Sequence, residues 1–235
     1  MSAESSGTRR VGAAIAAASI LGSLTACGSD DDSEATTPND STSASTAGAA
    51  TGEFRNLADD ESIRTKEYVG AVPDTEAYVA FAISRAVDND ALAGGQAYFC
   101  DGASVAKWFS LTPRDGALEF VAADGQTFVA EIADDGSISA TTAIAGADHS
   151  FTASEVPADG EAGLYLADHV IDPDLALDER GGWIVLADGT QRGAIKGGST
   201  ILPGSPLTLS TSTVSVSGRN ILLRAISEII GLDKK

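Results

Sequence analysis

The chain contains few of the side chains on which most catalytic and metal sites depend. Its 235 residues include only two cysteines and two histidines, His149 and His169. A zinc site needs several histidines or cysteines at ligand spacing. Neither histidine accompanies a Gly-x-Ser-x-Gly or Ser-x-x-Lys signature of a serine hydrolase. We therefore expect no cofactor, no zinc site and no histidine-based catalysis.

Basic residues are also scarce. The chain has 15 lysines and arginines against 34 aspartates and glutamates, which gives a net charge of −19. A nucleic-acid partner requires a basic surface for its phosphates, so the composition argues against that class of partner. Beyond residue 26, no run is long and apolar enough to predict a membrane span.

One apolar run does occur near the N-terminus, and it ends at a cysteine. The pair Arg9-Arg10 precedes the run Val11–Ala26, which closes as Leu24-Thr25-Ala26 before Cys27. At roughly sixteen residues, the run is short for a stable membrane span. A small residue before a cysteine at the close of an export signal resembles the bacterial lipobox.

That resemblance implies cleavage between Ala26 and Cys27 and acylation of the Cys27 sulfur, with palmitate a typical chain. The protein would then be lipid-anchored at the outer, extracytoplasmic face of the cell membrane, because two acyl chains anchor stably where one holds marginally. Two alternatives stay open: an uncleaved transmembrane anchor and an ordinary signal peptide. The Arg9-Arg10 pair also leaves open whether export is general secretory or twin-arginine.

The composition divides the chain into three parts. Residues 1–26 form the signal peptide, and residues 27–56 are the lipidated cysteine and an acidic Ser-, Thr- and Ala-rich linker. Such a linker cannot bury enough apolar surface to fold. Residues 57–235 form a single β-rich domain. If Cys27 carries lipid, Cys100 lacks a disulfide partner, and we expect it to be a small buried hydrophobe.

The body consists of short β-type runs separated by turn signals. Asp-Gly, a strong hairpin signal suited to type I′ turns, recurs at residues 101, 115, 124, 135, 159 and 188. The predicted strands are 68–72, 77–85, 96–100, 106–111, 117–122, 127–132, 137–143, 150–156, 163–167, 183–186, 191–196 and 207–216. Their apolar–polar alternation predicts one buried and one wet face. The fold class is therefore all-β, an antiparallel sandwich or barrel-like meander.

The last segment has a different period. Apolar residues at 221, 222, 225, 226, 229 and 230 fall on one helical stripe, and Gly231 suits a C-terminal cap. The sequence predicts a C-terminal α-helix over residues 219–231, packed on the sheet or closing one end of a barrel.

Three motifs carry a resemblance to a known kind of domain. They are residues 97–102 (Ala-Tyr-Phe-Cys-Asp-Gly) followed by Trp108, residues 162–167 (Ala-Gly-Leu-Tyr-Leu-Ala), and residues 182–191 (Gly-Trp-Ile-Val-Leu-Ala-Asp-Gly-Thr-Gln). Together they resemble a β-rich domain of exported actinobacterial lipoproteins. The resemblance implies a location outside the cytoplasm and assigns no catalytic residue.

Two groups of residues are candidates for a binding site. Trp108 and Trp183 are the large aromatics most able to line a ligand pocket, although core packing explains them as well. Asp172, Asp174 and Asp178 could meet in one loop and bind Ca²⁺ through oxygen ligands, but the loop lacks the EF-hand arrangement.

The sequence therefore predicts a membrane-anchored surface lipoprotein with a non-enzymatic binding or envelope-structural role. Its partners would be the membrane, through the lipid on Cys27, and a protein, glycan or lipid. Two alternatives remain: a carrier of a hydrophobic ligand, and an envelope hydrolase that uses paired carboxylates.

Overall fold

The computed structural model describes residues 62–114, 117–144, 146–157, 160–169 and 171–230. In this part of the chain, antiparallel strands are accompanied by one five-residue helix, which confirms the all-β fold class. Ala26, Cys27 and the predicted signal peptide and linker lie outside the described residues. Within the described ranges, no helix has the length and hydropathy that a bilayer crossing requires.

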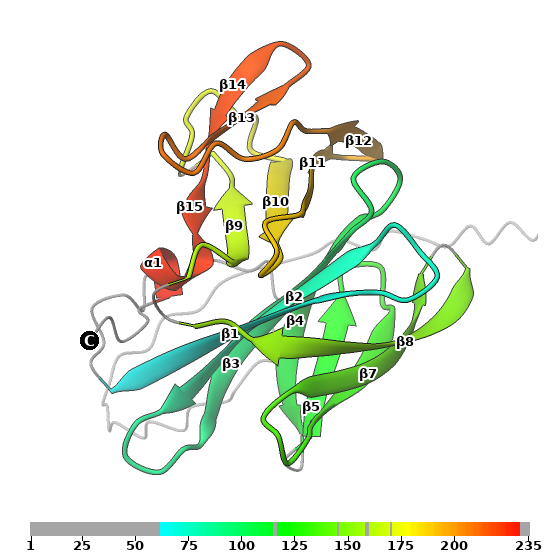
Figure 1. Cartoon of the computed structure of the whole chain (residues 1–235), viewed down its shortest axis with the longest axis vertical. Helices are drawn as coiled ribbons and strands as arrows, with labels where there is room; N and C mark the ends of the chain where they lie inside the picture. Colours follow the sequence, from blue (N-terminus) through cyan, green and yellow to red (C-terminus); the bar gives the residue numbers. More distant parts are fainter. Residues whose placement is uncertain (1–61, 115–116, 145, 158–159, 170, 231–235) are drawn as a thin grey trace, which may run out of the picture. The chain divides into compact units, whose positions relative to one another are not determined.

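The first eight strands close into a barrel in which neighbours in sequence pair antiparallel, shown in cyan to green in Figure 1. The strands are β1 (Ile63–Ala71), β2 (Tyr78–Ala86), β3 (Leu92–Cys100), β4 (Ala106–Arg114), β5 (Ala117–Ala122), β6 (Thr127–Ile132), β7 (Ile138–Ile144) and β8 (Ala147–Glu155). The barrel closes through a short pairing of Tyr68 and Val69 with Glu155 and Ser154. The barrel-like meander is thus the correct one of the two predicted architectures.

Three of the Asp-Gly pairs form hairpins where the sequence predicts them, but with another turn type. Gly160 instead stands between β8 and the strand Gly163–Ala167, which belong to different sheets. At residue pairs 124–125, 135–136 and 188–189, only the glycine has positive φ, between 81° and 84°. Its N–H donates to the carbonyl three residues earlier, as Gly125 does to Ala122 at 2.9 Å. This is the three-residue hairpin loop, a type I turn closed by a left-handed glycine, rather than type I′.

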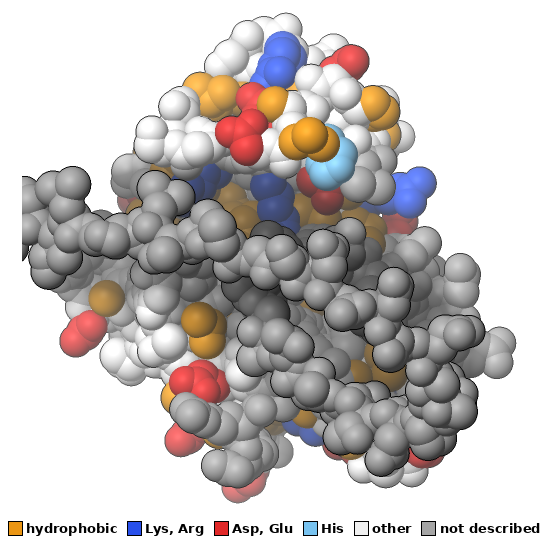
Figure 2. All heavy atoms as spheres, turned by 180° about the vertical axis from the view of Figure 1, so that it is seen from behind, with side chains coloured by type: hydrophobic (Ala, Val, Ile, Leu, Met, Phe, Trp, Pro, Cys, Tyr) orange, Lys and Arg blue, Asp and Glu red, His pale blue; other side chains and the backbone are white. Residues whose placement is uncertain are grey.

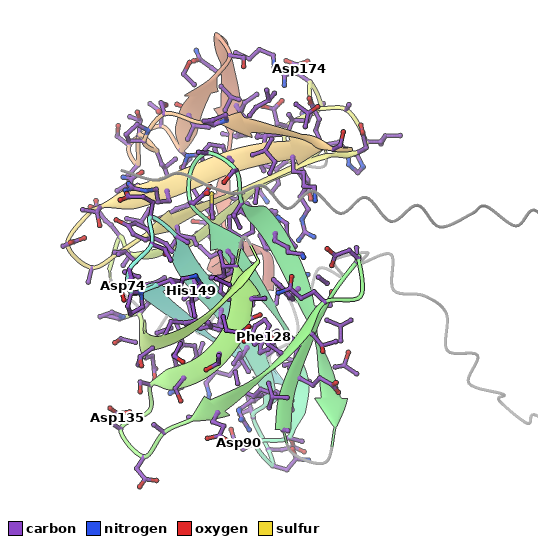
Figure 3. The ribbon with its side chains drawn as sticks, turned by 90° about the vertical axis from the view of Figure 1, so that its right-hand side faces the viewer. Asp74, Asp90, Phe128, Asp135, His149 and Asp174 are labelled. Atoms are coloured by element: carbon purple, nitrogen blue, oxygen red, sulfur yellow. The ribbon has the colours of Figure 1, made fainter. Side chains whose placement is uncertain are left out.

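Phenylalanines fill the interior of the barrel. Six of the seven in the chain lie there and are at most 5% exposed: Phe81, Phe99, Phe109, Phe120, Phe128 and Phe151. Phe128 is labelled inside the barrel in Figure 3, and its ring centroid lies 5.0–6.5 Å from the ring centroids of the other five. An eight-stranded barrel is just wide enough for side chains to fill it, so its interior is a packed core.

A second sheet covers one outer face of the barrel. Its strands, in spatial order, are β12 (Thr200–Pro203), β11 (Gln191–Gly197), β10 (Glu179–Val185), β9 (Gly163–Ala167) and β15 (Arg224–Ala225). The small side chains of Ala80 and Ala82 on β2 form one apolar cluster with Leu164, Ile184 and other residues of the sheet. β2 is therefore buried on both faces, contrary to the predicted one wet face.

The opposite face of this sheet has its own core. Trp183 is fully buried there among Val185, Ile195 and the hairpin of β13 (Thr213–Val216) and β14 (Arg219–Leu222). Its indole Nε1 donates to the carbonyl of Ser205 at 2.9 Å. Of the predicted strand 207–216, only residues 213–216 form a strand, β13.

The predicted helix over residues 219–231 is wrong for its first seven residues. Residues 219–222 form β14, residues 224–225 form β15, and α1 spans only Ile226–Ile230 within the described chain. Ser217 and Gly218 both have positive φ (50° and 80°), which turns the chain into a hairpin. Burial then alternates, because Ile221 is 1% exposed and Leu222 is 42% exposed. A short apolar run fits either period, and here tertiary pairing selects the strand.

Candidate functional site

The two predicted pocket tryptophans do not share a cavity. Gly182 faces the barrel, since a Cβ placed on it would lie 2.5 Å from the Tyr98 ring. Its strand neighbour Trp183 points the other way, because successive side chains alternate across a strand. Trp108 packs beside Tyr98 on the barrel side, with ring centroids 4.4 Å apart. Trp183 is fully buried, but it also lines a separate cavity of about 400 Å³ together with Gln191 and Arg192. Trp108 lines a different groove.

The three predicted calcium ligands are not brought together either. Asp172 is 8% exposed, and its carboxylate accepts backbone N–H groups from Asp174 at 3.0 Å and Leu222 at 2.9 Å. It therefore fixes its own loop against β14. Across the described residues, no group of three or more His, Cys, Asp or Glu side chains is placed to hold a metal ion.

One buried carboxylate was missed by sequence reasoning. Glu67 on β1 is 7% exposed and accepts N–H groups from Leu164 at 2.8 Å and Ser227 at 3.2 Å. Burial raises its pKa to about 7, although the N–H donors act in the opposite direction. Glu67 thus links the barrel to β9 and to α1. Both of its oxygens are engaged by backbone groups, which is a structural arrangement rather than that of a general acid.

Cys100 is buried in a core, and the two histidines lie in a strand and in a loop. Cys100 is fully buried, as predicted, and burial raises the pKa of its thiol to about 11. This is far above the range of reactive thiols. His149 lies within β8, where it pairs with Thr142, and His169 lies in the loop that follows β9.

A groove lined by both charged and apolar residues runs along the rim of the barrel where the second sheet meets it. One part, of about 410 Å³, is lined by Trp108, Asp178, Arg180 and Lys196 among others. A second part, of about 220 Å³, reaches the barrel mouth at Phe99. The two parts share Ala106, Lys107, Asp124 and Lys196. We call the whole the rim groove.

Trp108 and Arg180 form the rigid wall of the rim groove. The Arg180 guanidinium lies 4.0 Å from the centroid of the Trp108 ring and donates to Gln96 Oε1 at 2.8 Å. Burial lowers the pKa of Arg180 to about 10, and the charge of Asp168 opposes this shift. Arg180 therefore stays a cation at neutral pH, held by a cation–π contact.

Two lysines complete the positive lining. Lys107 on β4 points toward the barrel mouth, where its Nζ lies 2.6 Å from Asp124 and also donates to Gln126. Lys196 on β11 is exposed and stands directly opposite Arg180 in the β10–β11 ladder. Three cations thus line one groove of a strongly acidic chain, with Asp124 and Asp178 beside them.

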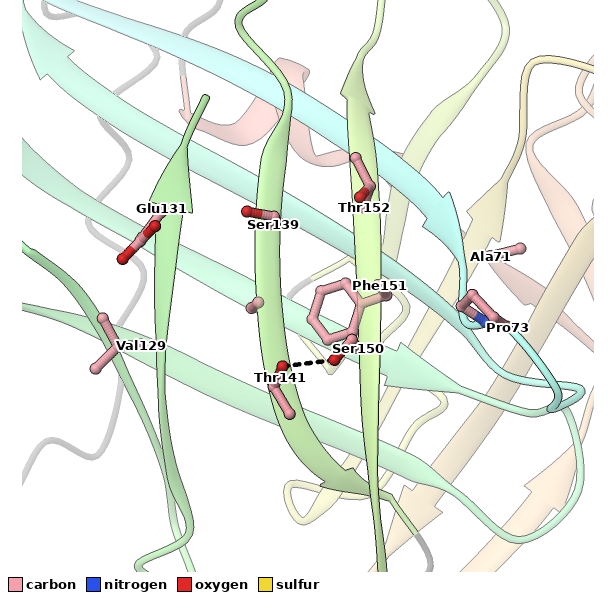
Figure 4. A pocket seen from close by; sticks show the side chains of 10 residues that line it. Ala71, Pro73, Val129, Glu131, Ser139, Thr141, Ser150, Phe151 and Thr152 are labelled. Atoms are coloured by element: carbon pink, nitrogen blue, oxygen red, sulfur yellow. Dashed lines mark hydrogen bonds between the residues drawn. The ribbon is translucent and has the colours of Figure 1, made fainter. Parts of the chain in front are cut away.

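The remaining surfaces are less specific. A shallow groove of about 760 Å³ crosses the outer faces of β6, β7 and β8, and Figure 4 shows the Thr141–Ser150 hydroxyl pair, 2.7 Å apart, in it. Its lining is mainly small hydroxyl and apolar side chains. On the face in Figure 2, the visible described side chains mix acidic, basic and apolar types. Among the residues that the structure describes, the large exposed hydrophobics are Val87, Val129, Ile132, Leu177 and Leu222.

Sequence reasoning found Trp108 and Asp178 but not the cations of the rim groove. The available signal was weak: Lys107 directly precedes Trp108 in a chain with few lysines. Arg180 and Lys196 are sixteen residues apart, and only the β10–β11 register makes them neighbours. No protein-family model, no curated protein and no solved structure matches this chain.

Proposed function

We propose that this protein is a lipid-anchored, extracytoplasmic binding module without catalytic activity, and that its ligand site is the rim groove. The anchor is supported by the lipobox resemblance at Ala26 and Cys27. The observation that carries the binding role is the groove itself. Its lining joins an aromatic edge, three cations and two carboxylates at the junction of the barrel and second sheet.

Ligand binding outside the barrel fits the packing of the core. A hydrophobic carrier needs an enclosed apolar cavity, whereas the six phenylalanines fill the barrel interior. A carboxylate hydrolase needs two opposed carboxyl groups about a substrate. Glu67, whose pKa is raised to about 7, instead has both oxygens engaged by backbone N–H groups. A surface binding role is therefore the function that these contacts support best.

Mass spectrometry of the membrane-associated native protein tests the anchor. We expect an N-terminus that begins at Cys27 and carries a diacylglyceryl mass. A Cys27→Ala variant should lose both this modification and membrane retention. A freely secreted chain with an unmodified Cys27 would refute the lipoprotein proposal.

A further inference from the structure

We propose that the rim groove binds an acidic saccharide, a sugar that carries a carboxylate or phosphate group. This inference rests on the proposed binding function and names the chemical class of its ligand. Three features of the described residues lead to it: a like-charge pair, an unused donor, and carboxylates placed beside the cations.

The like-charge pair is the first feature. Arg180 and Lys196 are directly opposite each other on adjacent antiparallel strands, so their side chains share one face. Like charges in such a pair are destabilising. Arg180 also interacts with the charge of Asp168 and donates to Gln96. An anion bound between Arg180 and Lys196 would add a charge-assisted hydrogen bond to each of these two cations. Lys107 supplies a third cation within the same groove.

The second feature is a donor without an acceptor. The indole Nε1 of Trp108 is buried and meets no hydrogen-bond partner among the described residues. Tyr98 and Arg180 pack on the Trp108 ring. These contacts hold the indole in place. A buried unmade hydrogen bond costs about 1–3 kcal/mol. Because Nε1 has almost no exposed surface, an acceptor oxygen of a ligand would offset this cost once the atoms that cover the nitrogen move aside.

The carboxylates explain why the ligand carries hydroxyl groups as well as an anion. Asp124, Asp178 and Gln126 also line the rim groove. Their oxygens accept hydrogen bonds, as sugar hydroxyls require. A simple inorganic anion would gain nothing from them and would be repelled by the two carboxylates. The larger part of the groove, about 410 Å³, lies in the size range of small-ligand sites.

The two tryptophans make the test direct. The full-length chain carrying Cys27→Ala has two indole N–H resonances in a ¹⁵N–¹H spectrum, from Trp108 and Trp183. Trp183 is an internal control, because its Nε1 is already bonded to Ser205 in the other core. Glucuronate and glucose 6-phosphate should shift the Trp108 resonance with a Kd of about 1 mM or below. The Trp183 resonance should stay in place, and inorganic phosphate should bind more weakly.

Variants identify the contacts. Trp108→Phe keeps an aromatic ring and removes the donor, so affinity should fall about tenfold. Isothermal titration calorimetry measures this variant, because it lacks the reporter resonance. Lys196→Gln should weaken binding about threefold, because Lys196 is exposed and partly screened. Lys66→Gln is the matched control, since Lys66 lies on β1 and pairs with Glu155; affinity should not change. Comparing the carboxylated and phosphorylated sugars decides which anion the groove prefers.

Two outcomes would overturn the inference. If neutral glucose shifts the Trp108 resonance as strongly as glucuronate, the groove binds sugars without using its cations. The proposed binding function then stands, but the inference that the ligand is acidic is refuted. If no probe moves that resonance at about 10 mM, near the weak end of measurable affinity, the rim groove is not an acidic-saccharide site. Membrane retention of the Cys27→Ala variant tests the anchor separately.

Discussion

The buried carboxylate of Glu67 makes the stability of the fold depend on pH. Its pKa rises from 4.5 to about 7 because burial penalises the charged form. The folded state therefore binds the proton more tightly than the unfolded chain does. The resulting stabilisation is complete below pH 4.5 and is lost as the pH rises through 7. The shift corresponds to about 3 kcal/mol, and the carboxyl is too buried for strong solvent screening.

The test compares the wild-type chain with Glu67→Gln by urea unfolding at pH 5, 6, 7 and 8. The wild type should lose up to about 3 kcal/mol of its free energy of unfolding across this range relative to the variant. The variant is the control for all other titrating groups, because glutamine does not titrate. The NH2 group that replaces one acceptor oxygen lowers the stability of the variant by an amount that does not change with pH. Parallel curves for the two proteins, or a wild type that gains stability as the pH rises, would refute the reasoning.

Three further predictions concern packing. Phe128→Ala should lower the free energy of unfolding by about 3–5 kcal/mol. Val129→Ala is the control: Val129 is 52% exposed, and its loss should cost under about 0.5 kcal/mol. Equal losses in urea titrations would contradict a packed barrel core. Gly182→Ala should destabilise the fold by about 1–3 kcal/mol, because the new Cβ would lie 2.5 Å from a tyrosine ring. Gly94→Ala places its Cβ in open space and should leave the thermal melt unchanged. The reverse order would show that the barrel and the second sheet pack differently. In the Cys27→Ala chain, the Cys100 thiol, whose pKa is raised to about 11, should react with a thiol reagent only after denaturation. Fast labelling of this folded chain would disprove the burial of Cys100.

Local signals predicted much of the fold. Each Asp-Gly pair at residues 124, 135 and 188 joins two strands, because a glycine that tolerates positive φ closes a tight hairpin whatever surrounds it. Alternation also placed β6 correctly, with Phe128 and Ala130 buried and Val129 exposed. These features depend on a few consecutive residues, which the sequence displays directly.

The C-terminal segment shows where local reasoning fails. The spacing of apolar residues from Ile221 to Ile230 fits a helix, yet β14 pairs with β13 over Thr213–Leu222 and the helix begins only at Ile226. A short apolar run is compatible with both periods. Hydrogen bonding to β13 and the burial of Ile221 in the core around Trp183 select the strand over the helix. Neither contact is visible in the sequence.

Short runs of residues are enough to predict the strand-rich body and the hairpins at residues 124, 135 and 188, because these signals are local. Tertiary structure alone decided that the meander closes into a barrel and that a second sheet covers its outer face. It also separated Trp108 from Trp183 and set Arg180 opposite Lys196. Strand register and layer packing arise from contacts between residues far apart in the chain, so composition and spacing do not specify them.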